Sequence, residues 1–146
     1  MDKTSEANWN VAWHQDLSIA VRERMDVRGF GPWSIKAGVV HVQPPREVLE
    51  RMVTLRLHLD DCMAENGPLR VIPCSHSQGV LTPAKVSQMT SESKAVTCTV
   101  GTGGAIVMRP LILHASSKAL RPSHRRVVHL EFSSAELPAP LQWGAA

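Results

Sequence analysis

A histidine and a carboxylate lie two residues apart in the stretch Trp13-His14-Gln15-Asp16-Leu17. The stretch continues an apolar-polar run that is typical of a β-strand. Because side chains at i and i+2 of an extended strand point to the same face, the His14 imidazole and the Asp16 carboxylate can converge on one point. They would supply two of the three protein ligands of a 2-His-1-carboxylate site, which holds non-haem Fe(II) and leaves coordination positions open. The pair alone is more often a surface histidine beside an acid, so other motifs must decide.

A third potential ligand, His114, follows the apolar run Leu111-Ile112-Leu113, which predicts a buried strand ending in His114-Ala115-Ser116. Arg125 lies eleven residues after His114, and with Arg126 it begins another predicted strand. A guanidinium forms bidentate, charge-assisted pairs with carboxylates, so either arginine could bind an acidic ligand. Parity places the two arginines on opposite strand faces and does not choose between them.

The clearest alternation in the chain runs from Val53 to Asp61. Its leucines at 55, 57 and 59 face one way, and its polar side chains, Arg56, His58 and Asp60, face the other. The polar face meets either solvent or a polar cavity, and the histidine motifs favour the cavity. Arg56 is therefore a candidate cofactor- or substrate-binding residue.

The remaining histidines carry weaker signals. His58 and His129 lie on the polar faces of predicted strands and could line a pocket. The other histidines are expected to be structural or solvent-exposed; they are His41, His76 and His124.

The elements that must position these residues are mostly short strands separated by Gly, Pro and Asn turns. Strands are predicted at 37–42, 53–61, 69–73, 95–100, 105–109, 111–116 and 125–132, besides the one that carries His14. The strands 53–61 and 69–73 are expected to form a hairpin, 44–52 a turn or single helical turn, 29–33 a loop, and 81–93 an irregular, mobile segment. The pattern favours a single domain, 1–146, with an antiparallel sandwich or partly open barrel, most simply a jelly roll.

Composition excludes several classes of protein. The net charge is +3 with scattered Lys and Arg, which gives nucleic-acid binding little support. No apolar run approaches about 18 residues, the length that a membrane-spanning helix needs. The polar N-terminus lacks the apolar core of a signal peptide. Cys62, Cys74 and Cys98 are odd in number and widely spaced. Such a pattern suits reduced thiols and predicts a cytoplasmic protein.

Four motifs in one order resemble the phytanoyl-CoA dioxygenase family of Fe(II)- and 2-oxoglutarate-dependent oxygenases. They are His14-x-Asp16, the segment Asn66-Gly67-Pro68-Leu69 with Pro73-x-Ser75-His76, His114-x-Ser116, and Arg125 at the family's spacing; the resemblance runs from about Asn8 to Phe132. It implies a mainly β, cupin-like double-stranded β-helix.

The resemblance also assigns roles to residues. It implies that His14, Asp16 and His114 bind Fe(II), and that Arg125 binds the distal carboxylate of 2-oxoglutarate with help from Ser116. The implied reaction uses O2 and decarboxylates 2-oxoglutarate to succinate and CO2, and it oxidises, usually hydroxylates, a small organic substrate.

The chain departs from the family pattern at three places. Cys74 replaces a usual glycine, Ala119 replaces a frequent asparagine, and only 13 residues precede His14, where family members carry a larger region. We therefore expect a fold that lacks the family's N-terminal part, with an uncovered sheet edge that favours a homo-oligomer. Two alternatives stay open: a truncated, non-catalytic module that binds metal or ligand, and a cupin-like zinc or iron enzyme that needs no keto acid.

Overall fold

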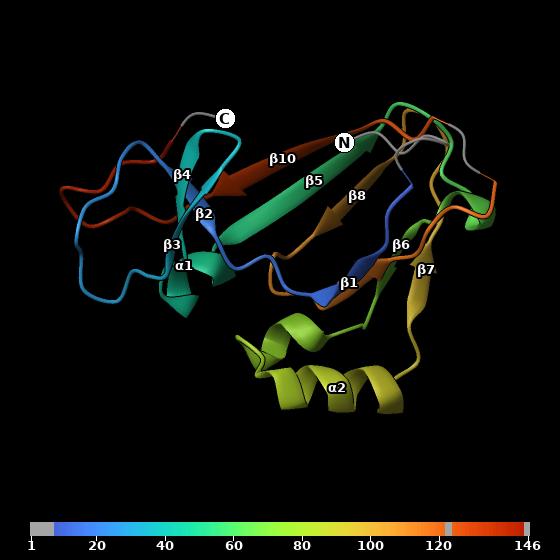
Figure 1. Cartoon of the computed structure of the whole chain (residues 1–146), viewed down its shortest axis with the longest axis horizontal. Helices are drawn as coiled ribbons and strands as arrows, with labels where there is room; N and C mark the ends of the chain where they lie inside the picture. The colour runs from blue at the N-terminus through green and yellow to red at the C-terminus, as the bar shows by residue number, and fades with distance from the viewer. Residues whose placement is uncertain (1–7, 122–123, 145–146) are drawn as a thin grey trace.

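A computed structural model describes residues 8–121 and 124–144 (Figure 1). Their elements are, in chain order, β1 (Val11–His14), β2 (Ile19–Val21), β3 (Trp33–Lys36), β4 (Val39–Val42), α1 (Arg46–Glu50), β5 (Met52–His58), η1 (Ala64–Asn66), β6 (Leu69–Val71), η2 (Ser75–Gln78), α2 (Pro83–Glu92), β7 (Val96–Cys98), β8 (Ala105–Met108), β9 (His114–Ser116) and β10 (Val127–Ser133). The fold is mainly β, which confirms the predicted class.

The strands form three antiparallel sheets. One has the order β1-β9-β6-β7, the second β10-β5-β8, and the third β2-β4-β3. In the second sheet, β10 pairs with β5 over its whole length, from Val127 opposite His58 to Ser133 opposite Met52. Because β1 and β9 are neighbours, the two segments that carry His14 and His114 lie side by side although 100 residues separate them in the chain.

Three expectations about strands were wrong. The strands at 53–61 and 69–73 do not form a hairpin, because β5 pairs with β10 and β8 while β6 pairs with β9 and β7. Cys62, which bridges to Val100, lies in the segment where the chain leaves the second sheet for the first. His114 begins its strand instead of ending it. Trp33–Lys36, partly assigned to a loop, forms β3.

The segment 81–93, expected to be irregular, contains the ten-residue helix α2. Thr82 is its N-cap and accepts a hydrogen bond from the Lys85 N–H at 3.3 Å, and Pro83 is its first residue. Thr followed by Pro is a regular helix-start signal, so the sequence contained the information for this helix.

Strand β5 turns its polar face inward. Thr54, Arg56 and His58 are buried, whereas Leu55 and Leu57 on the opposite face are half-buried. Of the residues predicted on this polar face, Arg56 lines a cavity, whereas His58 is buried two residues further along β5 and Asp60 pairs with Arg126. The leucine face lies on the outside of the sheet.

The main apolar core lies to one side of the two sheets that contain these polar residues. It joins β2, β4, α1 and the chain around Leu111, and its buried members are Ile19, Val21, Val42, Val48, Leu49, Met52, Leu111, Ala135 and Leu141. In Figure 1 the sheet β2-β4-β3 with α1 lies at one end of the molecule and α2 along another side. This core lies next to the starts of β5 and β9 and the ends of β1 and β10.

No helix within residues 8–121 and 124–144 is long and apolar enough to cross a membrane.

Candidate metal centre

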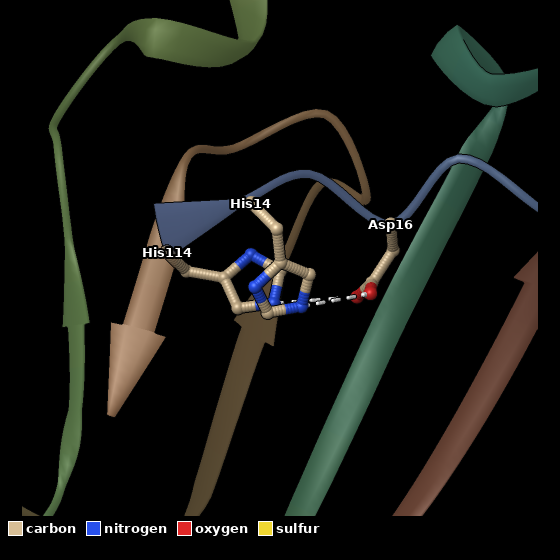
Figure 2. Close-up of side chains that lie close together, drawn as sticks. All are labelled: His14, Asp16 and His114. Carbon is tan, nitrogen blue, oxygen red and sulfur yellow. Dashed lines mark ion pairs between the residues drawn. The ribbon is translucent and has the colours of Figure 1, made fainter. Parts of the chain in front are cut away.

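His14, Asp16 and His114 come together between the sheets (Figure 2). The Nε2 atom of His14 lies 3.6 Å from one Asp16 carboxylate oxygen, and Nε2 of His114 lies 3.5 Å from the other. Each residue offers a ligand atom, and these atoms lie within 4.8 Å of one another. The imidazole centroids are 4.2 Å apart and the rings are tilted by 52°. Two imidazoles and one carboxylate that face a common point form the donor set of a 2-His-1-carboxylate metal site.

Backbone hydrogen bonds fix the tautomer of both histidines. Nδ1 of His14 lies 2.8 Å from the Ala12 carbonyl oxygen, and Nδ1 of His114 lies 2.8 Å from the Ile112 carbonyl oxygen. A carbonyl only accepts, so each Nδ1 carries the proton and the neutral ring presents the lone pair of Nε2. Metal-binding histidines are commonly oriented in this way by their second nitrogen.

The protonation preferences of the three groups differ. Burial lowers the pKa of His114 and keeps it neutral, whereas the hydrogen bond with Asp16 raises the pKa of His14. Burial tends to raise the pKa of Asp16, but the hydrogen bond from His14 and the charges of both histidines bring it below its ordinary value. The group therefore contains an ionised carboxylate and a neutral imidazole, as metal binding requires.

Gln15, between the two ligands, fixes the backbone that carries them. Its side chain is buried, donates hydrogen bonds to the carbonyl oxygens of Gly79 at 2.8 Å and Leu111 at 2.7 Å, and accepts one from the Leu81 N–H at 2.8 Å. Its neighbours thus face the metal centre while Gln15 ties three chain segments together. No role for Gln15 was expected, because a single glutamine without a motif around it does not indicate one.

Ser75 plays a similar part for His114. Its hydroxyl is fully buried, donates to the Ile72 carbonyl oxygen at 2.8 Å and accepts from the Leu113 N–H at 2.7 Å. The Pro-x-Ser-His motif therefore positions the residue just before His114. Its histidine, His76, is half-buried in η2.

A cavity of about 80 Å³ beside the centre contains the other predicted site residues. His14, Asp16 and His114 line it together with Arg125, Ser116 and Arg56. All three of the latter are buried, with exposed fractions of 7 to 8%. Arg125 donates hydrogen bonds to the Gly67 carbonyl oxygen and, at 3.9 Å, to the Cys62 sulfur.

The two neighbouring arginines have different surroundings. Arg126 is 56% exposed and forms a bidentate pair with Asp60, with N–O distances of 2.9 and 2.7 Å. It also donates its backbone N–H to Asp60 at 2.8 Å. Arg125, on the opposite face, lines the cavity.

Buried polar atoms of Arg56, which lines this cavity, and of His58, two residues further along β5, lack hydrogen-bond partners among the described residues. Within the described residues, Nε of Arg56 and both ring nitrogens of His58 are buried and have no hydrogen-bond partner. Burial, and then repulsion by Arg125, lowers the pKa of Arg56, and burial with both arginines lowers the pKa of His58. Two buried guanidinium groups that repel each other are stabilised by a bound anion. A dicarboxylate has the charge and acceptors that this space requires.

His129 has a larger place in the site than the sequence indicated. Its Nδ1 accepts a hydrogen bond from Nη1 of Arg56 at 3.0 Å, and its Nε2 lies 3.5 Å from a Glu131 carboxylate oxygen. Asp16, His129 and Glu131 also form a group whose ligand atoms lie within 4.8 Å of one another. Glu131 was not singled out from the sequence, although it shares the inward strand face with Arg125 and His129. His41, expected to be structural or exposed, is half-buried in β4.

Known structures resemble this chain over most of its length. AviO1 from Streptomyces viridochromogenes Tue57 is 25% identical with a TM-score of 0.62, over 96% of this chain and 51% of that protein. EctD from S. alaskensis with bound Fe is 25% identical with a TM-score of 0.50, over 57% and 32% of the two chains. SnoK, a non-haem α-ketoglutarate-dependent carbocyclase from nogalamycin biosynthesis, is 14% identical with a TM-score of 0.56. The match covers 88% of this chain and 44% of SnoK, and it shows similarity of fold alone. This chain spans about half the length of AviO1.

Fold and site together define a class of mainly β proteins with a candidate 2-His-1-carboxylate centre between antiparallel sheets. The sequence profile of the phytanoyl-CoA dioxygenase (PhyH) family matches residues 2–127. The chain belongs to this family. No protein of curated function matches it in sequence.

Proposed function

We propose that this single-domain chain provides the active site of a non-haem Fe(II)- and 2-oxoglutarate-dependent dioxygenase. It would oxidise a small organic substrate with O2 while 2-oxoglutarate is converted to succinate and CO2. The observation that carries the proposal is the convergence of Nε2 of His14, Nε2 of His114 and the Asp16 carboxylate beside the buried Arg125. The family and the iron bound by EctD support the same assignment.

Each residue has a stated part in this function. His14, Asp16 and His114 would hold Fe(II) from one side, and Fe(II) in such a site supplies the chemistry of O2 activation. Arg125 would bind the distal carboxylate of 2-oxoglutarate, with a hydrogen bond from the Ser116 hydroxyl. Arg56 adds positive charge to the same cavity, and the leucine face of β5 stays outside it.

The alternative is a metal- or ligand-binding module without turnover. An anaerobic titration with Fe(II) and then 2-oxoglutarate separates the two. The dioxygenase predicts a weak visible metal-to-ligand absorption band at one chelate per chain. His114→Ala should abolish the band, because it removes a ligand, while Arg126→Ala should keep it. Metal binding without the absorption band would support the metal-binding module without turnover instead of the dioxygenase.

A further inference from the structure

A second and larger cavity adjoins the metal centre. It has a volume of about 480 Å³ and lies along β10. His129 lines both this cavity and the smaller one that holds His14 and Asp16. Its walls are largely apolar and include Met52, Phe132 and Trp143. A mostly apolar hollow of this size with a few polar groups is typical of a small-molecule site.

The polar lining of this cavity consists of Glu131, Ser133 and the imidazoles of His41 and His129. Glu131 is the carboxylate among the described residues that line it, and no Lys or Arg is among them. The Glu131 side chain is 33% exposed. A carboxylate in a partly enclosed, apolar surrounding binds cations more strongly than it would in open water. The cavity is therefore complementary to a positively charged group.

Glu131 is held toward the metal centre by its neighbours. Arg56 only donates, so Nδ1 of His129 accepts the 3.0 Å hydrogen bond and the neutral ring carries its proton on Nε2. That proton faces the Glu131 carboxylate, whose oxygen lies 3.5 Å from Nε2, and Glu131 also lines the cavity. Because Glu131 offers an oxygen within 4.8 Å of one of Asp16, a group bound to it lies beside the metal centre.

We propose that the cavity along β10 binds a small aliphatic amine, with its ammonium group on Glu131 and its hydrocarbon body against the apolar walls. An ammonium group brings both a full positive charge and three hydrogen-bond donors, whereas a hydroxyl brings one donor and no charge. A carboxylate ligand is repelled. That the amine is a substrate, oxidised at a carbon near its nitrogen, rests on the dioxygenase function proposed above.

The first test compares head groups on the wild-type, metal-free protein. Isothermal titration calorimetry with n-hexylamine, n-hexanol and hexanoate holds the hydrocarbon body constant and changes the charge. The proposal predicts that n-hexylamine binds at least about tenfold more tightly than n-hexanol. Binding of hexanoate that 2-oxoglutarate displaces belongs to the cavity of Arg125 and Arg56. Equal affinities of n-hexylamine and n-hexanol would overturn the proposal, and no variant has to fold for this result.

The second test assigns the effect to one side chain. Glu131→Gln keeps the shape and removes the charge, so the advantage of n-hexylamine over n-hexanol should fall by about tenfold or more. Glu92→Gln, at the end of α2 and away from β10 in Figure 1, makes the same change of charge and should leave the advantage intact. If both variants behave alike, the amine binds elsewhere and the proposal fails.

The Fe(II) and 2-oxoglutarate titration separates this inference from the function on which it rests. A normal chelate band with no head-group preference would reject the amine site and keep the dioxygenase. A Glu131-dependent preference without the band would keep the amine site and reject the dioxygenase. A second equivalent of Fe(II) per chain, lost in Glu131→Gln, would instead assign Asp16, His129 and Glu131 to a metal ion and overturn the proposal.

Discussion

Arg125 and Arg126 are adjacent in the chain and differ in everything that decides ligand binding. Arg125 is buried in the cavity that His14, Asp16 and His114 also line, while Arg126 is exposed and paired with Asp60. A buried guanidinium repays its desolvation only when an anion completes its surroundings. The proposed function therefore makes a sharp distinction between two residues of the same type.

Arg125→Ala should weaken 2-oxoglutarate binding by two to three decades or more. Removing one member of a buried, hydrogen-bonded ion pair costs about 3–5 kcal/mol, and each 1.4 kcal/mol is about a factor of ten. Fe(II) affinity should change far less, since Arg125 is not a metal ligand. Calorimetric titrations of the wild type and the variant with each ligand check this.

Arg126→Ala is the matched control and should change neither affinity by more than a few-fold, because its exposed pair with Asp60 lies on the opposite strand face. Equal, small effects from both substitutions would mean that the cavity holds no keto acid. The chain would then be a metal-binding module.

Between elements, the turn that leads into β6 is coupled to β10 through one backbone oxygen. Gly67 follows η1 with φ of +60°, and its carbonyl oxygen accepts a hydrogen bond from Arg125. A Cβ at this position would meet the backbone oxygen of Ser117 and, at 3.1 Å, the backbone nitrogen of Ala119. Both the backbone conformation and the close approach of the segment after β9 therefore require glycine.

Gly67→Ala should destabilise the fold and reduce 2-oxoglutarate affinity together. The left-handed backbone alone costs an alanine about 1–2 kcal/mol, and the contact with Ser117 must add to that. A displaced carbonyl would release Arg125, so we expect a loss of affinity of roughly tenfold or more. Chemical denaturation and keto-acid titration measure the two effects.

Gly103→Ala provides the control for backbone strain. Gly103 has φ of +78°, and nothing lies within 4 Å of its added Cβ. Gly103→Ala should lower the free energy of unfolding by the same cost of about 1–2 kcal/mol for a left-handed alanine, and it should keep its 2-oxoglutarate affinity. If the two alanine variants lose stability and affinity equally, Gly67 does not position Arg125.

On the scale of the whole molecule, the sheet β10-β5-β8 presents an apolar outer face. Val107, Val128, Leu130 and Phe132 on this face are 68, 38, 41 and 56% exposed, and Leu130 and Phe132 also border the cavity along β10. In the part of the chain that the structure describes, β10 pairs along one edge only, with β5. An apolar face next to an unpaired strand edge favours association with another chain.

We predict that the protein self-associates through β10, giving a dimer or larger oligomer that depends on concentration. Leu130→Lys places a charge in the centre of the apolar face and should shift the association midpoint to about tenfold higher concentration or more. Light scattering over a wide concentration range measures this shift. A stable wild-type monomer throughout that range would contradict the prediction.

Leu120→Lys is the control for the added charge, because Leu120 is 82% exposed and lies outside the sheet. It should associate like the wild type. An equal effect of both lysines would mean that net charge, not the β10 face, controls association.

Several features could be predicted because they depend on local chemistry. Alternation of side chains predicted β5 and β10, and turn residues separated most of the strands. The start of α2 was also local, at Thr82 and Pro83, and its absence from the expectations was an error of interpretation. The pairing of β6 with β9 and β7 could not be predicted in this way, because the residues of one strand do not specify which other strand pairs with it.

The sequence by itself determined the set of chemical groups: two histidines and a carboxylate with the spacing of the family, and an arginine eleven residues after His114. Only the tertiary structure decided which face of each strand is inside. On β5 and β10 the more apolar face points outward, because the interior here holds Arg56, Arg125 and His129 around a polar cavity. Alternation defines two faces and leaves their direction to the packing of the other sheet. The same packing brought Glu131 beside Asp16, and no local sequence pattern could have predicted this contact.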